Sequence, residues 1–102
     1  MSMLHTVNKS PFESNGLKSC LAHASKGDTV LLIEDGVYAA LKGTTVSGDM
    51  WQRRIDIKFC VLGADLAARG LDKGRLIDGV RIVDYGGFVD LVTEHDRTQA
   101  WL

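Results

Sequence analysis

The chain has 102 residues, 45% of them hydrophobic, and a formal net charge of −1 at pH 7, which predicts one domain spanning residues 1–102. Its 12 basic and 13 acidic residues are spread along the sequence, so the chain lacks the basic stripe that a nucleic-acid partner requires. No run reaches the roughly 18 apolar residues of a membrane span, residues 1–11 lack the apolar core of a signal peptide, and the two cysteines are expected to stay free thiols. We therefore expect a cytoplasmic protein that binds neither nucleic acid nor membrane.

The first predicted elements are a strand and a helix. Met3–Val7 is a short apolar strand. The helix is expected to begin at Ser10, because Ser10, Pro11 and Glu13 have the spacing of a capping box with proline at the first helical position. It is expected to run to about Ser25–Lys26 and to end at Gly27. Its apolar stripe, at helical spacing, consists of Leu17, Cys20, Leu21 and Ala24.

The middle of the chain alternates between apolar runs and polar stretches. Thr29–Glu34 is predicted as the second strand, and Asp35 is expected to cap a short helix over Gly36–Leu41. Lys42–Arg54 is rich in Gly, Thr and Ser and has little periodicity, which predicts a mobile loop. Ile55–Leu62 is predicted as the third strand, because its alternation places isoleucine and phenylalanine on one face and polar residues on the other.

The last third of the chain contains a short helix over Asp65–Arg69, a polar connector over Asp72–Asp78, a strand over Val80–Asp84 and a helix over Gly87–His95. Along the whole chain, the apolar runs stop abruptly at an acid or a glycine, and a helix-forming stretch follows. That order is typical of a parallel sheet with crossover helices. The sequence therefore predicts an α/β fold: a small three-layer α/β/α domain with a mostly parallel sheet of about five strands.

Several kinds of site are excluded by the absence of their motifs. The chain has no G-x-x-x-x-G-K-[ST] and no G-x-G-x-x-G after a strand, which excludes the common nucleotide sites. It has no G-x-S-x-G elbow of a hydrolase. Cys20 and His23 do not have a recognised zinc-ligand spacing with Cys60. We expect neither a cofactor nor a metal.

Cys20 is the residue with the most chemical interest, and two interpretations stay open. It falls in the apolar stripe of its helix, where a free cysteine is often simply buried. However, His23 is three residues further on the same helix surface and could accept the thiol proton. An unperturbed thiol with a pKa of about 8.5 is only a few per cent thiolate at neutral pH, so Cys20 would need that histidine or a partner chain to become a nucleophile.

Other candidate residues are interpreted as structural. Cys60 lies in the middle of a predicted strand, and His5 and His95 lie on apolar surfaces, where histidines are usually hydrogen-bonded components of the core. So small a chain is not expected to cover both faces of a parallel sheet, which predicts an oligomer. Four large aromatic residues near loops and termini could pack within the chain or at a protein interface: Tyr38, Trp51, Phe88 and Trp101.

Four segments in order resemble the DsrH/TusB family of sulfur-relay proteins, and together they cover essentially the whole chain. They are Leu4–Phe12 (LHTVNKSPF), Leu31–Ala40 (LLIEDGVYAA), Val61–Leu71 (VLGADLAARGL) and Val83–Leu91 (VDYGGFVDL), and the chain closes on Ala100–Leu102 (AWL). Residues 42–54 match no pattern of the family, so the resemblance implies nothing about them.

The resemblance implies a subunit that does not act alone. Family members assemble with DsrE/TusD-type and DsrF/TusC-type chains into a heterohexamer with two copies of each. The thiol that carries sulfur as a persulfide belongs chiefly to the DsrE/TusD-type subunit, and sulfur passes to a DsrC/TusE-type acceptor. TusB-type members serve 2-thiolation of the tRNA wobble uridine, whereas DsrH-type members serve sulfur oxidation.

Cys20 favours the DsrH branch of the family, because chains of that type resemble this one in having a cysteine in the first helix. The resemblance implies a functional role for Cys20, which either holds a persulfide transiently or shapes the docking site of the acceptor. His23 is the candidate for thiol activation because of its spacing on the helix. Two alternatives remain: a free-standing thiol enzyme that uses Cys20 and His23, and a purely structural subunit with an inert Cys20.

Overall fold

The computed structural model describes residues 2–102 and contains a five-stranded sheet in the order β4-β3-β2-β1-β5. All four neighbouring pairs are parallel, which confirms the predicted α/β fold. The strands are β1 (Met3–Val7), β2 (Thr29–Leu32), β3 (Lys58–Leu62), β4 (Arg81–Val83) and β5 (Arg97–Trp101).

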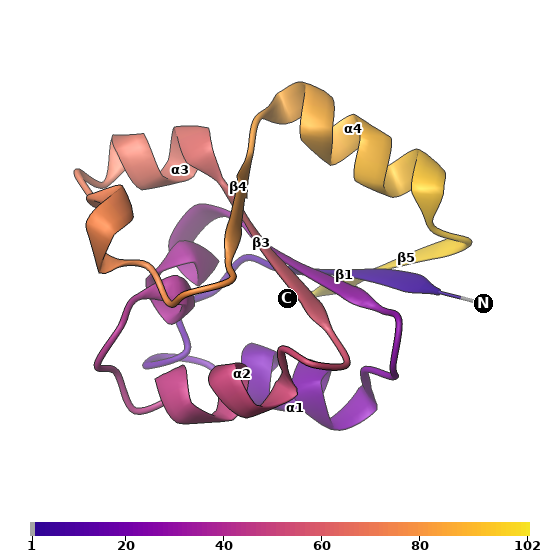
Figure 1. The fold of residues 1–102 in the computed structure, drawn as a ribbon, viewed down its shortest axis with the longest axis horizontal. Helices are drawn as coiled ribbons and strands as arrows, with labels where there is room; N and C mark the ends of the chain where they lie inside the picture. Colours follow the sequence, from indigo (N-terminus) through magenta and orange to yellow (C-terminus); the bar gives the residue numbers. More distant parts are fainter. Residues whose placement is uncertain (1) are drawn as a thin grey trace.

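Helices lie on both faces of the sheet, with α1 and α2 on one side and α4 on the other (Figure 1). None of the helices within residues 2–102 has the length and apolar character needed to cross a membrane. The α-helices are α1 (Gly16–His23), α2 (Ser47–Arg53), α3 (Gly63–Ala68) and α4 (Tyr85–Glu94), and the 3-10 helices are η1 (Glu34–Ala40) and η2 (Lys73–Arg75).

The core is divided by the sheet into a larger and a smaller cluster. The larger cluster contains residues of α1, α2 and α3, such as Leu17, Met50 and Leu66, packed on alternate positions of the central strands. The smaller cluster lies under α4 and consists of Leu4, Leu31, Cys60 and Leu91. Alternation along each strand explains the division, because successive side chains point to opposite faces of a sheet.

The predicted start of the first helix was wrong. Residues 11–13 form turns, and α1 begins only at Gly16. Ser10 does accept a hydrogen bond from a nearby amide, that of Phe12 (3.2 Å), but it stabilises a turn and not a helix. The helix also ends earlier than expected, at His23, because Gly27 serves a later turn at φ +92°.

The predicted mobile loop over Lys42–Arg54 was also wrong, because its second half forms α2. Met50 is buried against the larger cluster. At the end of this helix, the Arg53 guanidinium donates hydrogen bonds to the backbone oxygens of Leu21 (2.6 Å) and Ala24 (3.0 Å). A single apolar anchor and one arginine therefore hold a helix whose Gly- and Ser-rich sequence has weak intrinsic propensity.

Two strands are shorter than predicted. β2 ends at Leu32, and Glu34 already belongs to η1, whose N-terminus has no side-chain cap; Asp35 instead accepts hydrogen bonds from Arg69. β3 begins at Lys58, and Ile55 is 80% exposed. The remaining elements differ from the predictions by one or two residues, within the usual uncertainty of element ends.

The sheet has the predicted number of about five strands, but the position of β5 was not predicted. Residues 97–100 are exposed and polar or small, so they lack the apolar run by which the other strands were found. β5 nevertheless pairs in parallel with β1 along its whole length, from Met3 opposite Arg97 to Val7 opposite Trp101.

Candidate functional site

Cys20 lies on the face of α1 that packs against the sheet, and its side chain is fully buried. Burial raises the pKa of its thiol to about 12, the negative charge of Asp28 adds to this effect, and the positive charge of Arg53 opposes it. At neutral pH the thiol is therefore protonated and shielded. The structure agrees with the apolar-stripe interpretation of its position.

His23 lies one turn further along α1, exposed to solvent. Its Nδ1 donates a hydrogen bond to the backbone oxygen of Ser19 (2.8 Å), and its ring lies 5.3 Å from the Trp101 ring at an interplanar angle of 41°. Within residues 2–102, no hydrogen bond joins His23 to the Cys20 thiol. Cys20 and His23 thus lie on the same helix, but the thiol does not donate a hydrogen bond to the histidine within the described residues.

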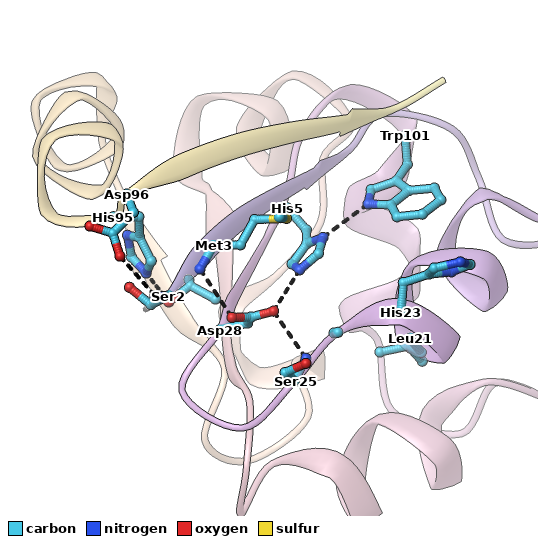
Figure 2. A network of polar contacts seen from close by, with 12 residues as sticks. Ser2, Met3, His5, Leu21, His23, Ser25, Asp28, His95, Asp96 and Trp101 are labelled. Carbon is cyan, nitrogen blue, oxygen red and sulfur yellow. Dashed lines mark hydrogen bonds and ion pairs between the residues drawn. The ribbon is translucent and has the colours of Figure 1, made fainter.

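A buried polar network connects β1, β5 and the loop before β2 (Figure 2). The indole Nε1–H of Trp101 donates to Nδ1 of His5 (3.0 Å). Nδ1 must then be unprotonated, so Nε2 of His5 carries the proton and donates to the Asp28 carboxylate (2.9 Å). The same carboxylate accepts hydrogen bonds from the backbone amides of Met3 (3.0 Å) and Ser25 (3.0 Å).

Opposing effects act on the Asp28 carboxyl group. Burial raises its pKa, but the hydrogen bonds from Ser25, His5 and Met3 lower it, and the net pKa is below the ordinary value of an aspartate. Asp28 is therefore an anion at neutral pH, and it fixes the tautomer and orientation of His5. Sequence reasoning missed this network, because His5 is 23 residues from Asp28 and 96 from Trp101.

His95 and Cys60 have structural positions. His95 donates from Nδ1 to the backbone oxygen of Leu91 (2.7 Å) and accepts at Nε2 from the Thr29 hydroxyl (2.8 Å). Cys60 is fully buried beneath α4, and burial raises the pKa of its thiol. Both positions agree with the structural interpretation made from the sequence.

The carboxyl ends of the strands, where α/β folds usually bind ligands, are held by internal contacts. Glu34 has a left-handed backbone (φ 49°), and its amide donates to the Asp65 carboxylate (2.7 Å). Gly36 lies so close to the chain that an added Cβ would be 2.1 Å from the backbone oxygen of Val7. The described residues that line this edge are polar, and neither cysteine is among them.

Comparisons with known proteins give matches over most of the chain. The family model described as "DsrH like protein" matches residues 9–98. Protein TusB of Escherichia coli O81 (strain ED1a) is 38% identical over 99 residues, which is 97% of this chain and 100% of TusB. TusB of the K12 strain is 37% identical over the same length and with the same coverage.

Two solved structures share the fold. The crystal structure of the ychN protein from E. coli has a TM-score of 0.85 at 17% identity and covers 98% of both chains. The structure of MTH1491 from Methanobacterium thermoautotrophicum, a protein of unknown function, has a TM-score of 0.74 at 19% identity and covers 97% of both chains. At these identities the likeness concerns the fold alone.

Proposed function

The chain belongs to the DsrH/TusB family of sulfur-relay proteins, and we propose that it is a non-autonomous subunit of a sulfur-transfer complex. Membership of this family implies partnering with TusC-like and TusD-like chains. We further propose that the complex is a heterohexamer with two copies of each chain, that it works in the cytoplasm, and that it hands sulfur to a DsrC/TusE-type acceptor.

One observation carries this proposal: both thiols of the chain, Cys20 and Cys60, are fully buried. In a persulfide relay, an acceptor thiolate attacks the outer sulfur of a donor persulfide, the S–S bond breaks, and the donor cysteine leaves as a thiolate. The attacking thiol must be accessible and ionised. A chain whose thiols are protonated and covered is suited to supporting a carrier cysteine on a neighbouring subunit.

Cys20 has a second, more direct role available to it. If α1 moves away from the sheet in the complex, the Cys20 thiolate could attack the outer sulfur of a sibling's persulfide, and the sibling cysteine would leave as a thiolate. Nε2 of His23, which makes no hydrogen bond within residues 2–102, could accept the Cys20 proton. The cysteine in the first helix, by which this chain resembles DsrH-type proteins, supports this role. A free-standing thiol enzyme is less well supported, because the isolated chain keeps Cys20 buried.

Two destinations for the sulfur are proposed. Cys20 favours sulfur oxidation, because DsrH-type chains resemble this one in having it. The TusB relatives at 37% and 38% identity favour 2-thiolation of the tRNA wobble uridine. Expression in E. coli cells that lack TusB separates the two: restored 2-thiouridine in tRNA supports the second destination, and failure to restore it despite a folded chain supports the first.

The subunit proposal is tested by co-expressing the chain with its DsrE/TusD-type and DsrF/TusC-type siblings and treating the purified complex with glutathione persulfide, whose outer sulfur is transferred to a protein thiolate while glutathione leaves as a thiolate. We expect co-purification and a mass gain of one sulfur atom on a sibling cysteine. Cys20→Ser, with Cys60→Ser as the matched control, reports whether Cys20 carries sulfur. A chain that stays a stable monomer and binds neither sibling contradicts the proposal.

A further inference from the structure

Cys20 belongs to a stripe of three residues along one side of α1. Gly16, Cys20 and His23 stand at spacing i, i+4 and i+7, so they share that side of the helix. The two ends of the stripe lie next to the same residue of β5, Trp101. A Cβ at position 16 would be 3.9 Å from the backbone oxygen of Trp101, and the centroids of the His23 and Trp101 rings are 5.3 Å apart.

Trp101 therefore extends along this stripe. Its backbone lies beside the start of α1, and its ring lies beside His23 at the end of α1, as Figure 2 shows. Positions 16 and 23 are about 10 Å apart along the helix axis at 1.5 Å per residue, and position 20 falls between them. Trp101 also packs against the core cluster to which Cys20 belongs. The tryptophan thus covers the side of α1 on which the thiol lies.

The covering side chain belongs to an edge strand. Among the described strands β5 pairs only with β1, and residues 97–100 and Leu102 are exposed. The other thiol, Cys60, lies instead in β3, which is paired on both sides and covered by α4. Exposed edge segments open locally at a lower free-energy cost than central strands. The two buried thiols therefore differ in the part of the fold that must move to expose them.

Few interactions hold Trp101 in its closed position. The indole Nε1–H donates one hydrogen bond, to Nδ1 of His5 (3.0 Å). The indole ring packs against the rings of His5 and His23, with centroids 6.2 Å and 5.3 Å away, and its backbone pairs with β1 opposite Val7. Loss of these contacts leaves α1 and the central strands in place, so Trp101 can move without global unfolding.

We propose that Trp101 is a gate over the Cys20 thiol. In the closed state its indole is bonded to His5 and packed against His23, and the thiol is shielded. Outward movement of the end of β5 uncovers the stripe, so α1 need not leave the sheet. The inference rests on the proposed function, because it gives the route by which a sibling's persulfide reaches Cys20. The gate itself is a property of this chain and is testable in the isolated protein.

The test measures the rate at which iodoacetamide alkylates each thiol in the folded chain, by mass spectrometry of the peptides that contain Cys20 and Cys60. Trp101→Ala removes the ring and the indole donor, and Gln99→Ala, an exposed position of the same strand, is the matched control. We expect Trp101→Ala to speed alkylation of Cys20 about tenfold or more, with Cys60 unchanged, and Gln99→Ala to change neither rate.

Cys60 is the internal reference in this experiment, because global unfolding exposes both thiols together. A Trp101→Ala chain in which both thiols react faster by the same factor overturns the gate, since Trp101 then acts only through global stability. A Cys20 rate equal to that of the wild-type chain overturns it as well.

His23→Ala provides a second variant that does not depend on how well Trp101→Ala folds. His23 is exposed on α1, so its replacement leaves the core intact and removes one aromatic contact of the gate. We expect alkylation of Cys20 to become about twofold to tenfold faster, with Cys60 unchanged. A histidine that activates the thiol predicts the opposite sign. A Cys20 rate that falls or stays the same in this variant contradicts the gate.

Co-purification with the DsrE/TusD-type and DsrF/TusC-type siblings reports on the proposed function separately. If the wild-type chain captures the siblings but Trp101→Ala leaves Cys20 unreactive, the gate fails and the proposed function stands. If Trp101→Ala exposes Cys20 but the wild-type chain captures neither sibling, the gate stands and the proposed function fails.

Discussion

At the scale of single residues, two side-chain hydrogen bonds connect β1 to β5 and to the loop before β2. They join Trp101 to His5 and His5 to Asp28. The central member, His5, is buried with each ring nitrogen used once. Removing either neighbour leaves a buried nitrogen without a partner, which costs more than the lost hydrogen bond itself.

Trp101→Phe tests this arrangement, because it keeps an aromatic ring and removes only the N–H donor. We expect a loss of about 1–2 kcal/mol in the free energy of unfolding, measured by urea denaturation. Trp51→Phe is the matched control, since Trp51 is exposed on α2 and its replacement is expected to change stability by less than about 0.5 kcal/mol. Equal effects of the two variants would contradict the network's role.

Asp28 gives the network a pH dependence. Its pKa is lowered in the folded chain, so its contribution to stability is fully present above the unfolded value of about 3.9 and is lost as pH falls through the folded pKa. We expect Asp28→Asn to lower the urea midpoint clearly at pH 7 and much less at pH 3. A difference between wild type and variant that is constant over this range would contradict the assignment.

Because the Cys20 thiol is buried, we expect it to react slowly with alkylating reagents in the folded chain. With a pKa of about 12, its thiolate fraction at pH 8 is about a thousandfold below that of an ordinary cysteine. We expect iodoacetamide to label Cys20 and Cys60 slowly and comparably in the isolated chain, and rapidly in urea, as followed by mass spectrometry. Fast labelling of Cys20 in the folded chain, slowed by His23→Ala, would instead indicate a free-standing thiol enzyme.

Local sequence predicted the residues whose environment is set by their own element. The apolar stripe of α1 predicted that Cys20 lies in the core, and strand alternation predicted that Cys60 and Phe59 point to different faces of the sheet. The partners of His5 could not be predicted, because a hydrogen bond between residues 96 positions apart has no local signature. The site therefore required the topology of the sheet.

At the scale of elements, the two helix predictions that failed have different physical causes. Ser10 has a capping-box pattern, but Gly16 and the polar residues before it favour turns, so the pattern stabilises a turn and α1 starts later. The 42–54 segment lacks helical periodicity, yet Met50 provides enough burial to hold α2. Local turn preference therefore decided where α1 begins, whereas tertiary packing decided that α2 forms.

The close approach of η1 to β1 requires a glycine at position 36. η1 passes so close to β1 that a Cβ at position 36 would meet the Val7 backbone oxygen at 2.1 Å, and a strand backbone cannot move aside. We expect Gly36→Ala to destabilise the chain by about 2–3 kcal/mol or more. Gly48→Ala is the control, since nothing lies within 4 Å of its Cβ position in α2, and it is expected to stabilise by about 0.5–1 kcal/mol. Thermal melts of both variants measure the contrast.

At the scale of the whole molecule, the predicted fold class was confirmed because parallel strands buried on both faces leave a strong sequence signal. The position of β5 was not predicted, because residues 97–100 are exposed and polar or small. β5 is held by its pairing with β1 and not by an apolar run of its own, so the local sequence carries no signal of its position.

The placement of β5 also governs how the chain is made. β1 is translated before the other four strands described here, yet its second neighbour is built from residues 97–101, so a nascent chain keeps one edge of β1 unpaired until those residues have been made. Such an edge invites pairing with other chains, and pairing over so long a sequence separation is slow. A product that terminates before residue 97 is therefore expected to aggregate rather than to fold into a slightly smaller version of the domain.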